Sequence, residues 1–483
     1  MRYRHAIALF PSILTPALMW ACHAPSRGAP ATEAPAEPSE PGSDVVAFVD
    51  VDVVPMDSER ILDGQTVLVR GDRIAAVGPV ASVAVPPGAT VIDGSGKYLM
   101  PGLVDMHAHI FAPDELPLYL ASGVTSLRNM NGAPMHLEMR AQIATGALLG
   151  PTIYTATPII DGVPVYWPGA DSIDDPSRAE SIILAHKRAG YDFVKLYMNL
   201  DQAGYEAVLA AARKHGMKTA GHVPTRLGMH EVLAHPIGSL EHLWAYFLTP
   251  SASPALQTGA EILRVEAESW LDVSEAEMQE LARALAQAGI WSCATMTVRK
   301  RAPMVENLEA GLASVEQRYV SPLVKNFWLH ENGYLLLSKE DYETLRLSYG
   351  KMQMMVRALR DAGARILLGS DTPNPFVLAG FSVHEELVNL VAAGLTPYEA
   401  IRAGTRDAAE FLGQDRELGS VAGGMRADLL LIDGNPLADV RNASKITGVM
   451  LRGQWLPAER LQHLLDDMVA SFAASSPTGD RHH

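Results

Sequence analysis

Residues 102–109, GLVDMHAH, give the clearest single indication of the fold. A short apolar run ends there in two histidines, His107 and His109, which are separated by one residue. Successive side chains of a β-strand point to opposite faces, so both histidines would lie on the same face of one strand. The stretch predicts a strand that carries reactive side chains at its C-terminal end.

The long middle part of the chain repeats this pattern. Between roughly residues 100 and 413, apolar strand-like runs alternate with amphipathic helical runs, which favours a parallel sheet with crossover helices. Eight such units predict a (β/α)8 TIM barrel with insertions, assigned to residues 101–413. The expected strands are 103–109, 123–130, 152–157, 192–198, 218–223, 239–244, 290–297 and 366–371. The longest insertion, 245–273 together with 299–349, is rich in charged and aromatic residues and predicts a lid.

Runs of period two at both ends of this middle part predict a second, smaller domain. Turns separate these runs, which is typical of antiparallel strands. They cover residues 46–54, 66–78, 90–99, 427–434 and 446–456. We therefore expect a small β-sandwich domain built from residues 44–100 and 414–460. Residues 461–483 are expected to form a C-terminal helix and tail.

Composition excludes several functional classes. The chain has 483 residues with a formal net charge of −16, 48% hydrophobic and 19% charged residues, so it can bury a large core and is not disordered. Its 2 cysteines cannot form a disulfide framework or a CxxC zinc site. The acidic balance argues against a nucleic-acid partner, because neutralising phosphates requires clustered basic residues. Any metal ion must be held by His, Asp, Glu or Lys.

The first 43 residues resemble an export segment followed by a spacer. Residues 1–21 combine a basic start with an apolar stretch shorter than the roughly 20 residues of a membrane span, which predicts a signal peptide. Cys22 follows directly, as in bacterial lipoprotein signals whose new N-terminal cysteine is acylated. A plain secretory signal is the alternative. Residues 22–43, rich in proline and alanine, predict a linker. We expect an exported protein, periplasmic or anchored to a bacterial membrane through a lipid on Cys22.

Polar residues also end or interrupt four further predicted strands. A single histidine at a strand end is commonly a hydrogen-bonded structural residue, and a buried lysine or aspartate costs several kcal/mol unless it is paired or bound to metal. Together with His107 and His109, the set comprises Lys195 in DFVKLYM, His222 in KTAGHV, His242 in SLEHLW and Asp371 after ILLGS. Six such residues at strand ends are hard to explain by packing alone.

These stretches resemble the metal-dependent amidohydrolase superfamily, and the resemblance covers nearly all of the chain after residue 45. The residues that carry it are VIDGSGKYLMPGLVDMHAH (91–109), the Lys195 strand, GH (221–222), EH (241–242), GSDT (369–372) and AGTRDAAEFLG followed by GSVAGGMRADLLLIDGNPL (403–437). Within the superfamily the chain is most similar to the imidazolonepropionase-related, prolidase-like branch, marked by DFVKLY and GHVP.

The resemblance implies a binuclear metal site. In it His107 and His109 would bind one metal ion, His222 and His242 a second, and Asp371 the first. Lys195, carboxylated by CO₂, would bridge both ions. Nitrogen and oxygen ligands favour zinc but also fit Mn, Co or Ni.

The reaction that this site implies is hydrolysis of an amide, of the dipeptide or N-acyl amino acid type, by a metal-bridging hydroxide. Asp371 would take the proton of the hydroxide and return it to the leaving amine. A deaminase or a hydrolase of cyclic amides or lactones is the alternative within the superfamily. A surface lipoprotein that binds a ligand without catalysis is a third hypothesis, which the complete ligand set disfavours.

Further residues are candidates for contact with a small-molecule substrate. Tyr197 is two positions beyond Lys195 and would face the same way, either as a donor to the developing oxyanion or as a packing residue. The candidates for substrate binding are Arg128, Tyr166, Trp167, Trp244 and His384. A structural ion pair is the alternative for Arg128, and packing is the alternative for the aromatic residues. The sequence indicates neither the substrate nor the oligomeric state.

Overall fold

The computed structural model describes residues 45–250 and 259–475, with side chains up to residue 472. The predicted signal peptide, linker and Cys22, and the end of the predicted tail, lie outside the described residues. Within the described ranges, no helix combines the length and the apolar character that a membrane span needs.

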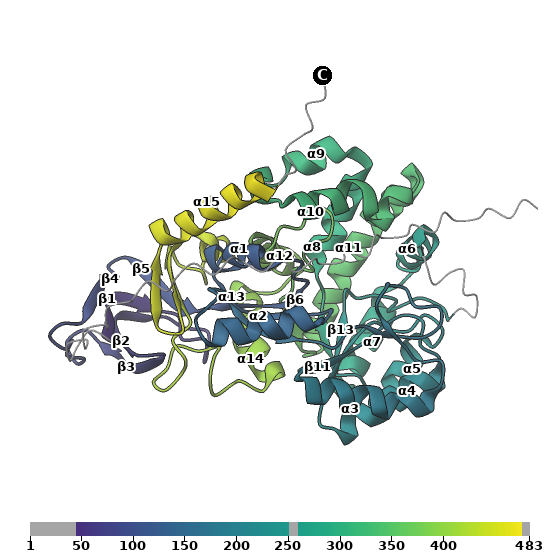
Figure 1. Cartoon of the computed structure of the whole chain (residues 1–483), viewed down its shortest axis with the longest axis horizontal. Helices are drawn as coiled ribbons and strands as arrows, with labels where there is room; N and C mark the ends of the chain where they lie inside the picture. The colour runs from purple at the N-terminus through teal and green to yellow at the C-terminus, as the bar shows by residue number, and fades with distance from the viewer. Residues whose placement is uncertain (1–44, 251–258, 476–483) are drawn as a thin grey trace, which may run out of the picture. The chain divides into compact units, whose positions relative to one another are not determined.

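Strands from both ends of the described chain pair in a single eight-stranded sheet, where the purple and yellow ends of the chain meet in Figure 1. Its strands are β1 (Val45–Val53), β2 (Leu62–Arg70), β3 (Arg73–Pro79), β4 (Thr90–Asp93), β5 (Lys97–Pro101), β16 (Leu429–Asp433), β17 (Ile446–Leu451) and β18 (Gln454–Pro457). The antiparallel pair of β5 and β16 joins the two ends of the chain.

The expectation that this sheet is antiparallel was wrong in one part. Strands β4 and β5 both run parallel to β1, so the sheet is mixed. The alternation of apolar and polar residues places a side chain on one face or the other, but it contains no information on the direction of the neighbouring strand.

All eight strands predicted for the middle part are present, and they lie in two parallel sheets. One sheet contains β6 (Leu103–Ala108), β7 (Val124–Asn129) and β8 (Thr152–Thr155). The other contains β9 (Ile160–Asp161), β10 (Asp171–Ser172), β11 (Phe193–Leu196), β12 (Lys218–Gly221), β13 (Ser239–Glu241), β14 (Trp291–Cys293) and β15 (Ile366–Leu367). The two-residue strands β9 and β10 were not predicted, because so short a run shows no periodicity.

Two single bridges connect the two sheets. Ala156 pairs with Phe193 between β8 and β11, and Ala108 pairs with Thr372 beyond β15. The amide of Met106 also donates to the carbonyl oxygen of Leu368 at 2.8 Å. The eight predicted strands therefore follow one another around both sheets in chain order.

Helices follow most of these strands. They are α1 (Leu116–Ala121), α2 (Pro134–Ala144), α3 (Ala179–Ala189), α4 (Gln202–Lys214), α5 (Gly228–Ala234), α7 (Glu275–Ala288), α11 (Lys339–Asp361), α12 (Phe381–Ala392), α13 (Pro397–Ala403), α14 (Arg406–Leu412) and α15 (Ala458–Ser475). Three further helices lie within the predicted insertion: α6 (Gly259–Glu268), α9 (Leu308–Ala313) and α10 (Pro322–Asn326). Helix α8 (Met296–Arg301) begins at the end of the predicted strand 290–297 and runs into the insertion. Helix α7 begins with a capping box of Ser274 and Glu277 and ends at Gly289, whose φ is +67°.

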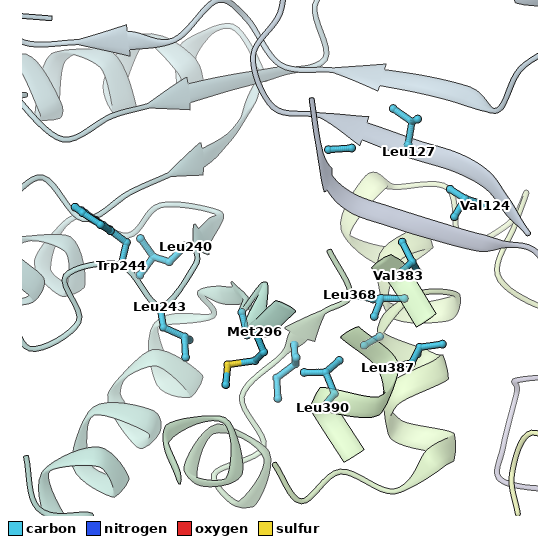
Figure 2. Packing of buried hydrophobic residues seen from close by; sticks show 14 of the residues in the cluster. Val124, Leu127, Leu240, Leu243, Trp244, Met296, Leu368, Val383, Leu387 and Leu390 are labelled. Atoms are coloured by element: carbon cyan, nitrogen blue, oxygen red, sulfur yellow. The ribbon is translucent and has the colours of Figure 1, made fainter. Parts of the chain in front are cut away.

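A continuous apolar core packs the helices against the strands. Figure 2 shows Leu368 beside Val383 and Leu387 of α12, and these three side chains are fully buried. Burying one such side chain stabilises the fold by roughly 1.5–3 kcal/mol. Parallel strands covered by helices are apolar throughout their length, and all four residues of β11 are indeed buried. Against that background Lys195, only 1% exposed, is an anomaly.

Candidate metal centre

The six predicted metal ligands line one cavity of about 420 Å³. Each lies at or just beyond the C-terminal end of a parallel strand. They are His107 in β6, His109 directly after β6, Lys195 in β11, His222 after β12, His242 after β13 and Asp371 after β15. Parallel strands end at the same edge, so residues separated by up to 264 positions in sequence meet there.

Asp371 lies at the middle of the histidine cluster. Its Oδ1 atom is 3.4 Å from His107 Nε2 and 3.2 Å from His109 Nε2, and its Oδ2 atom is 3.4 Å from His242 Nδ1. The ligand atoms of His107, His242 and Asp371 all lie within 4.8 Å of one another, a spacing that could hold a metal ion. Asn374 Nδ2 donates to Asp371 Oδ2 at 2.9 Å and orients the carboxylate.

Left-handed backbone turns help to aim these side chains. Asp371 has a φ of +57° and His242 has a φ of +65°. Such conformations of residues other than glycine cost of order 1–3 kcal/mol and are found mainly at functional sites. The strain indicates that the position of these two side chains matters more here than local backbone preference.

A hydrogen bond determines which nitrogen of His107 is free. His107 Nδ1 is 2.7 Å from Glu241 Oε2 in a fully buried setting. Burial holds the pKa of His107 well below its ordinary value, so the ring is neutral. The carboxylate can only accept, so the proton lies on Nδ1 and the lone pair on Nε2 points to Asp371. This nitrogen has no hydrogen-bond partner.

His222 gives the strongest indication that this cavity can hold a metal ion. Its side chain is 5% exposed, and neither of its ring nitrogens has a hydrogen-bond partner. Burial lowers the pKa of His222 well below its ordinary value, which leaves a neutral ring with a free lone pair. Its ring centroid is 4.9 Å from that of His242. Buried polar groups are rarely left unpaired, so a metal ion fits this residue and its neighbours.

Lys195 is the buried lysine of the cavity. Burial lowers the pKa of its amine to about 8, against the opposite influence of the Glu241 and Asp371 carboxylates. A substantial fraction of the amine is therefore neutral near pH 8, and only the neutral amine is nucleophilic.

The aromatic candidates also line the cavity. Trp167 Nε1 donates to the Tyr197 hydroxyl at 2.8 Å, which leaves the hydroxyl proton free for another acceptor. Burial raises the pKa of Tyr197 well above its ordinary value, so the group stays protonated. The ring centroids of Tyr166 and Trp167 are 5.3 Å apart, and those of Trp244 and His222 are 5.8 Å apart. Their positions are those expected of a cavity wall, and their contact with substrate stays a prediction.

Arg128 does not line the cavity, and its assignment as a substrate-binding residue was wrong. Its side chain is fully buried. It donates to both oxygens of Glu241 at 2.9 Å, to Ser239 Oγ at 2.9 Å and to the carbonyl oxygen of Met106 at 2.5 Å. The ion-pair alternative describes it correctly. Glu241, which joins this arginine to His107, was missed as a functional residue. The signal available in the sequence was an acidic residue inside an apolar strand, next to His242.

His384 was also assigned incorrectly as a substrate contact. Its ring lies on α12 and contacts the carbonyl oxygen of Ser122 through Nε2 at 2.9 Å. It is not among the residues that line the cavity.

The inserted region supplies much of the remaining cavity wall, and none of these residues was singled out from the sequence. They are Leu263, Arg299, Leu323, Phe327, Glu331, Asn332, Gly333 and Tyr334, and Val298 directly before the insertion also lines the cavity. No short motif connects them with the strand ends, so sequence spacing could not identify them. The basic run RKR at 299–301, directly after a predicted strand end, was the one available signal.

Comparison with known proteins finds relatives that match most of this chain. The model of the amidohydrolase family matches residues 98–456. An imidazolonepropionase from Rubrobacter xylanophilus is 28% identical over 386 residues, which cover 76% of this chain and 84% of that protein. Adenine deaminases are further relatives, and the chain spans about half the length of those that match along most of it.

The solved structures that are similar in fold include the following two. The bottromycin amidohydrolase has a TM-score of 0.70 at 24% identity, with 89% of this chain and 91% of that chain covered. A Xaa-Pro dipeptidase with methionine bound in its active site has a TM-score of 0.64 at 18% identity, with 86% and 100% covered.

Proposed function

Because the chain belongs to the amidohydrolase family, we propose that it is a binuclear metal-dependent hydrolase that cleaves an amide bond in a dipeptide or N-acyl amino acid. Hydrolysis of C–N bonds is the activity that the family and its relatives support. One observation carries the binuclear proposal: unpartnered nitrogens of His107 and His222 face the same cavity as His109, His242 and Asp371.

Two divalent ions, with zinc the expected metal, fit this donor set. His107, His109 and Asp371 would hold one, and His222 and His242 the other. Bound ions of this kind polarise a carbonyl group and lower the pKa of water toward about 7.

Side chains of the cavity would carry out the proton transfers. As water attacks the amide carbon, Asp371 takes one proton from the water and returns it to the nitrogen as the C–N bond breaks. The Tyr197 hydroxyl, whose proton is free because its oxygen accepts from Trp167, would donate to the developing oxyanion. Neutral buried histidines are suited to metal binding, because protonation would remove the lone pair.

Lys195 would act as a carboxylated lysine. Its neutral amine would attack CO₂, forming an N–C bond and releasing one proton to solvent, and the product would be an anionic carbamate with two oxygen ligands. Burial favours this reaction, since the ammonium form is destabilised in the cavity wall. A cation beside two divalent ions would be repelled, whereas a carbamate would bridge them.

The test of this proposal is the metal content of Lys195→Ala. We expect the wild type to bind two metal ions per chain, and the variant to lose at least one of them and about 10³-fold or more in kcat. Plasma mass spectrometry and a carbamate signal after labelling with ¹³CO₂ measure the two effects. Lys218→Ala is the matched control, because Lys218 is an exposed residue at the opposite end of the neighbouring strand β12. Two bound metal ions and full turnover in Lys195→Ala would refute the bridging role.

A deaminase, or a hydrolase of a cyclic amide or lactone, is the second candidate. The adenine deaminase and imidazolonepropionase relatives favour it. Lys195 disfavours a mononuclear version of such an enzyme, which would have no use for a lysine in the cavity wall. A measured stoichiometry of one metal ion per chain would reverse the ranking.

We also propose that the two parallel sheets form one closed (β/α)8 barrel, with a small β-sandwich domain beside it. The bridges Ala156–Phe193 and Ala108–Thr372 support closure, because one connects β8 with β11 and the other connects β6 with the segment beyond β15. The domain limits proposed from the sequence, and closure of the insertion as a lid over the cavity, belong to the same proposal.

Export, with a lipid on Cys22, is proposed from the sequence of the first 43 residues alone. Mass spectrometry of the mature N-terminus tests it, and an unmodified terminus that begins after Cys22 would contradict it.

A further inference from the structure

Arg299 is a buried cation on the wall of the reaction cavity. It lies on α8, just beyond β14, and its side chain is 4% exposed. Among the described residues that line the cavity it is the one arginine. The proposed chemistry uses the strand-end residues and assigns no role to this guanidinium.

The protein provides only part of the contacts that Arg299 can make. Arg299 Nη2 lies 2.9 Å from Glu266 Oε2, but the two atoms are not aligned for a hydrogen bond. The other oxygen of Glu266 accepts from Trp270 Nε1 at 3.0 Å. A guanidinium has five N–H donors in a planar fork, so most of those of Arg299 are available to another acceptor.

Trp244 connects Arg299 with the metal centre. The guanidinium carbon is 5.6 Å from the centre of the Trp244 ring, and that ring lies 5.8 Å from the ring of His222. The cation and the His222 ring are thus both neighbours of the same indole ring. Trp244 Nε1 is buried and has no partner, so a second unused donor lies in the same part of the cavity wall.

We propose that Arg299 binds the carboxylate of the substrate and thereby selects amides whose amine side is an amino acid. This inference rests on the proposed amide hydrolysis and specifies its substrate class: N-acyl amino acids or dipeptides. A carboxylate matches the planar fork of a guanidinium, and charge-assisted hydrogen bonds are about twice as strong as neutral ones. After cleavage, the released amino acid would keep its carboxylate on Arg299 while its new amine faces the metal centre.

The test compares zinc-loaded wild type with Arg299→Met on paired substrates. One member of each pair is an N-acetyl amino acid, and the other lacks only the carboxylate, as in N-acetylphenylalanine and N-acetyl-2-phenylethylamine. The wild type is expected to prefer the carboxylate by about 10- to 100-fold in kcat/KM. Arg299→Met should lose this preference, mainly through KM, and Arg299→Lys should restore part of it.

Arg301→Met is the matched control. Arg301 lies on the same helix and pairs with Glu385, but it does not line the cavity, so the preference should be unchanged. Arg299→Met leaves Glu266 buried without its partner, which could destabilise the fold. The double variant Arg299→Met with Glu266→Gln removes both charges and is measured in parallel, with thermal unfolding as the check on folding.

Binding of the products separates this inference from the proposed function. Calorimetry measures a panel of amino acids against their decarboxylated amines on the zinc-loaded protein. If the wild type cleaves no amide but prefers the amino acids in an Arg299-dependent way, the proposed function fails and the carboxylate site stands. Equal preference in wild type and Arg299→Met, or no carboxylate preference across the whole panel, would overturn the inference.

Discussion

Two buried polar regions meet at His107, and they differ in whether their hydrogen bonds are satisfied. On one side, Glu241 accepts from Arg128, Ser239 and His107, with both of its oxygens in use. On the other side, His107 Nε2 and both nitrogens of His222 have no partner. The first region is a closed network of hydrogen bonds. The second, which we call the open region, consists of histidine nitrogens that face a cavity, and each ring has a lone pair free for a metal ion.

This difference distinguishes buried polar residues that stabilise the fold from residues of the same type that can bind a ligand. A buried charge is tolerated where its partners are complete, and such a group has nothing left to offer a ligand. Unpaired buried groups cost free energy unless something else binds them. Charge alone does not distinguish Arg128 from Arg299. Their contacts do, because Arg128 is enclosed by the Glu241 network and Arg299 lines the cavity.

Asp371→Asn gives the largest expected effect, because it acts on the open region. The amide side chain cannot take a proton from water, so kcat should fall by about 10²- to 10⁴-fold. Steady-state kinetics on an N-acetyl amino acid measure the loss, and plasma mass spectrometry shows how much metal is bound. Turnover within a few-fold of wild type would exclude Asp371 as the proton carrier.

Glu241→Gln tests the closed network and should act on stability. Removing one partner of a buried ion pair leaves the Arg128 charge uncompensated, which costs about 3–5 kcal/mol. Because Glu241 also orients His107, metal affinity should fall by about 10- to 100-fold. Urea denaturation and metal titration measure the two effects.

An exposed ion pair provides the control for Glu241→Gln. Lys97 and Asp433 are 2.8 Å apart at the surface, and Asp433→Asn should cost less than about 1 kcal/mol. Equal effects of the two substitutions on the free energy of unfolding would contradict the distinction between the closed network and a surface pair.

Substitution of His384 gives the smallest expected effect, and it tests whether an unpartnered nitrogen outside the cavity also binds metal. The Nδ1 atom of this residue is also unpartnered, but His384 is not among the residues that line the cavity. Burial lowers the pKa of His384 from 6.5 to about 4. The unfolded chain therefore binds the proton more tightly, and this residue's contribution to stability is lost as the pH falls from about 6.5 to 4, by at most about 3 kcal/mol.

His384→Gln should reduce this acid sensitivity and leave the metal content unchanged. Urea denaturation of wild type and variant at pH 7 and pH 4.5 measures the difference. A loss of metal in His384→Gln would show that an unpartnered nitrogen alone is enough to indicate a ligand.

The local sequence pattern was sufficient to predict the strands and the six cavity residues at their ends. Apolar runs that end in His107, His222 or Asp371 are visible within a few residues, and parallel strands bring such ends together. The errors concern residues whose role depends on a distant partner. Arg128 is explained by Glu241, which is 113 positions away, and His384 by Ser122, which is 262 positions away.

The sequence by itself determined the order of the strands, the residues at their ends and the family. These features depend on alternation, on residue type and on short motifs. Only the tertiary structure decided that β4 and β5 run parallel to β1, that Arg128 is enclosed by Glu241, and that Arg299 enters the cavity wall. The physical reason is that hydrogen-bond satisfaction and burial depend on contacts between segments far apart in the chain, which no local period encodes.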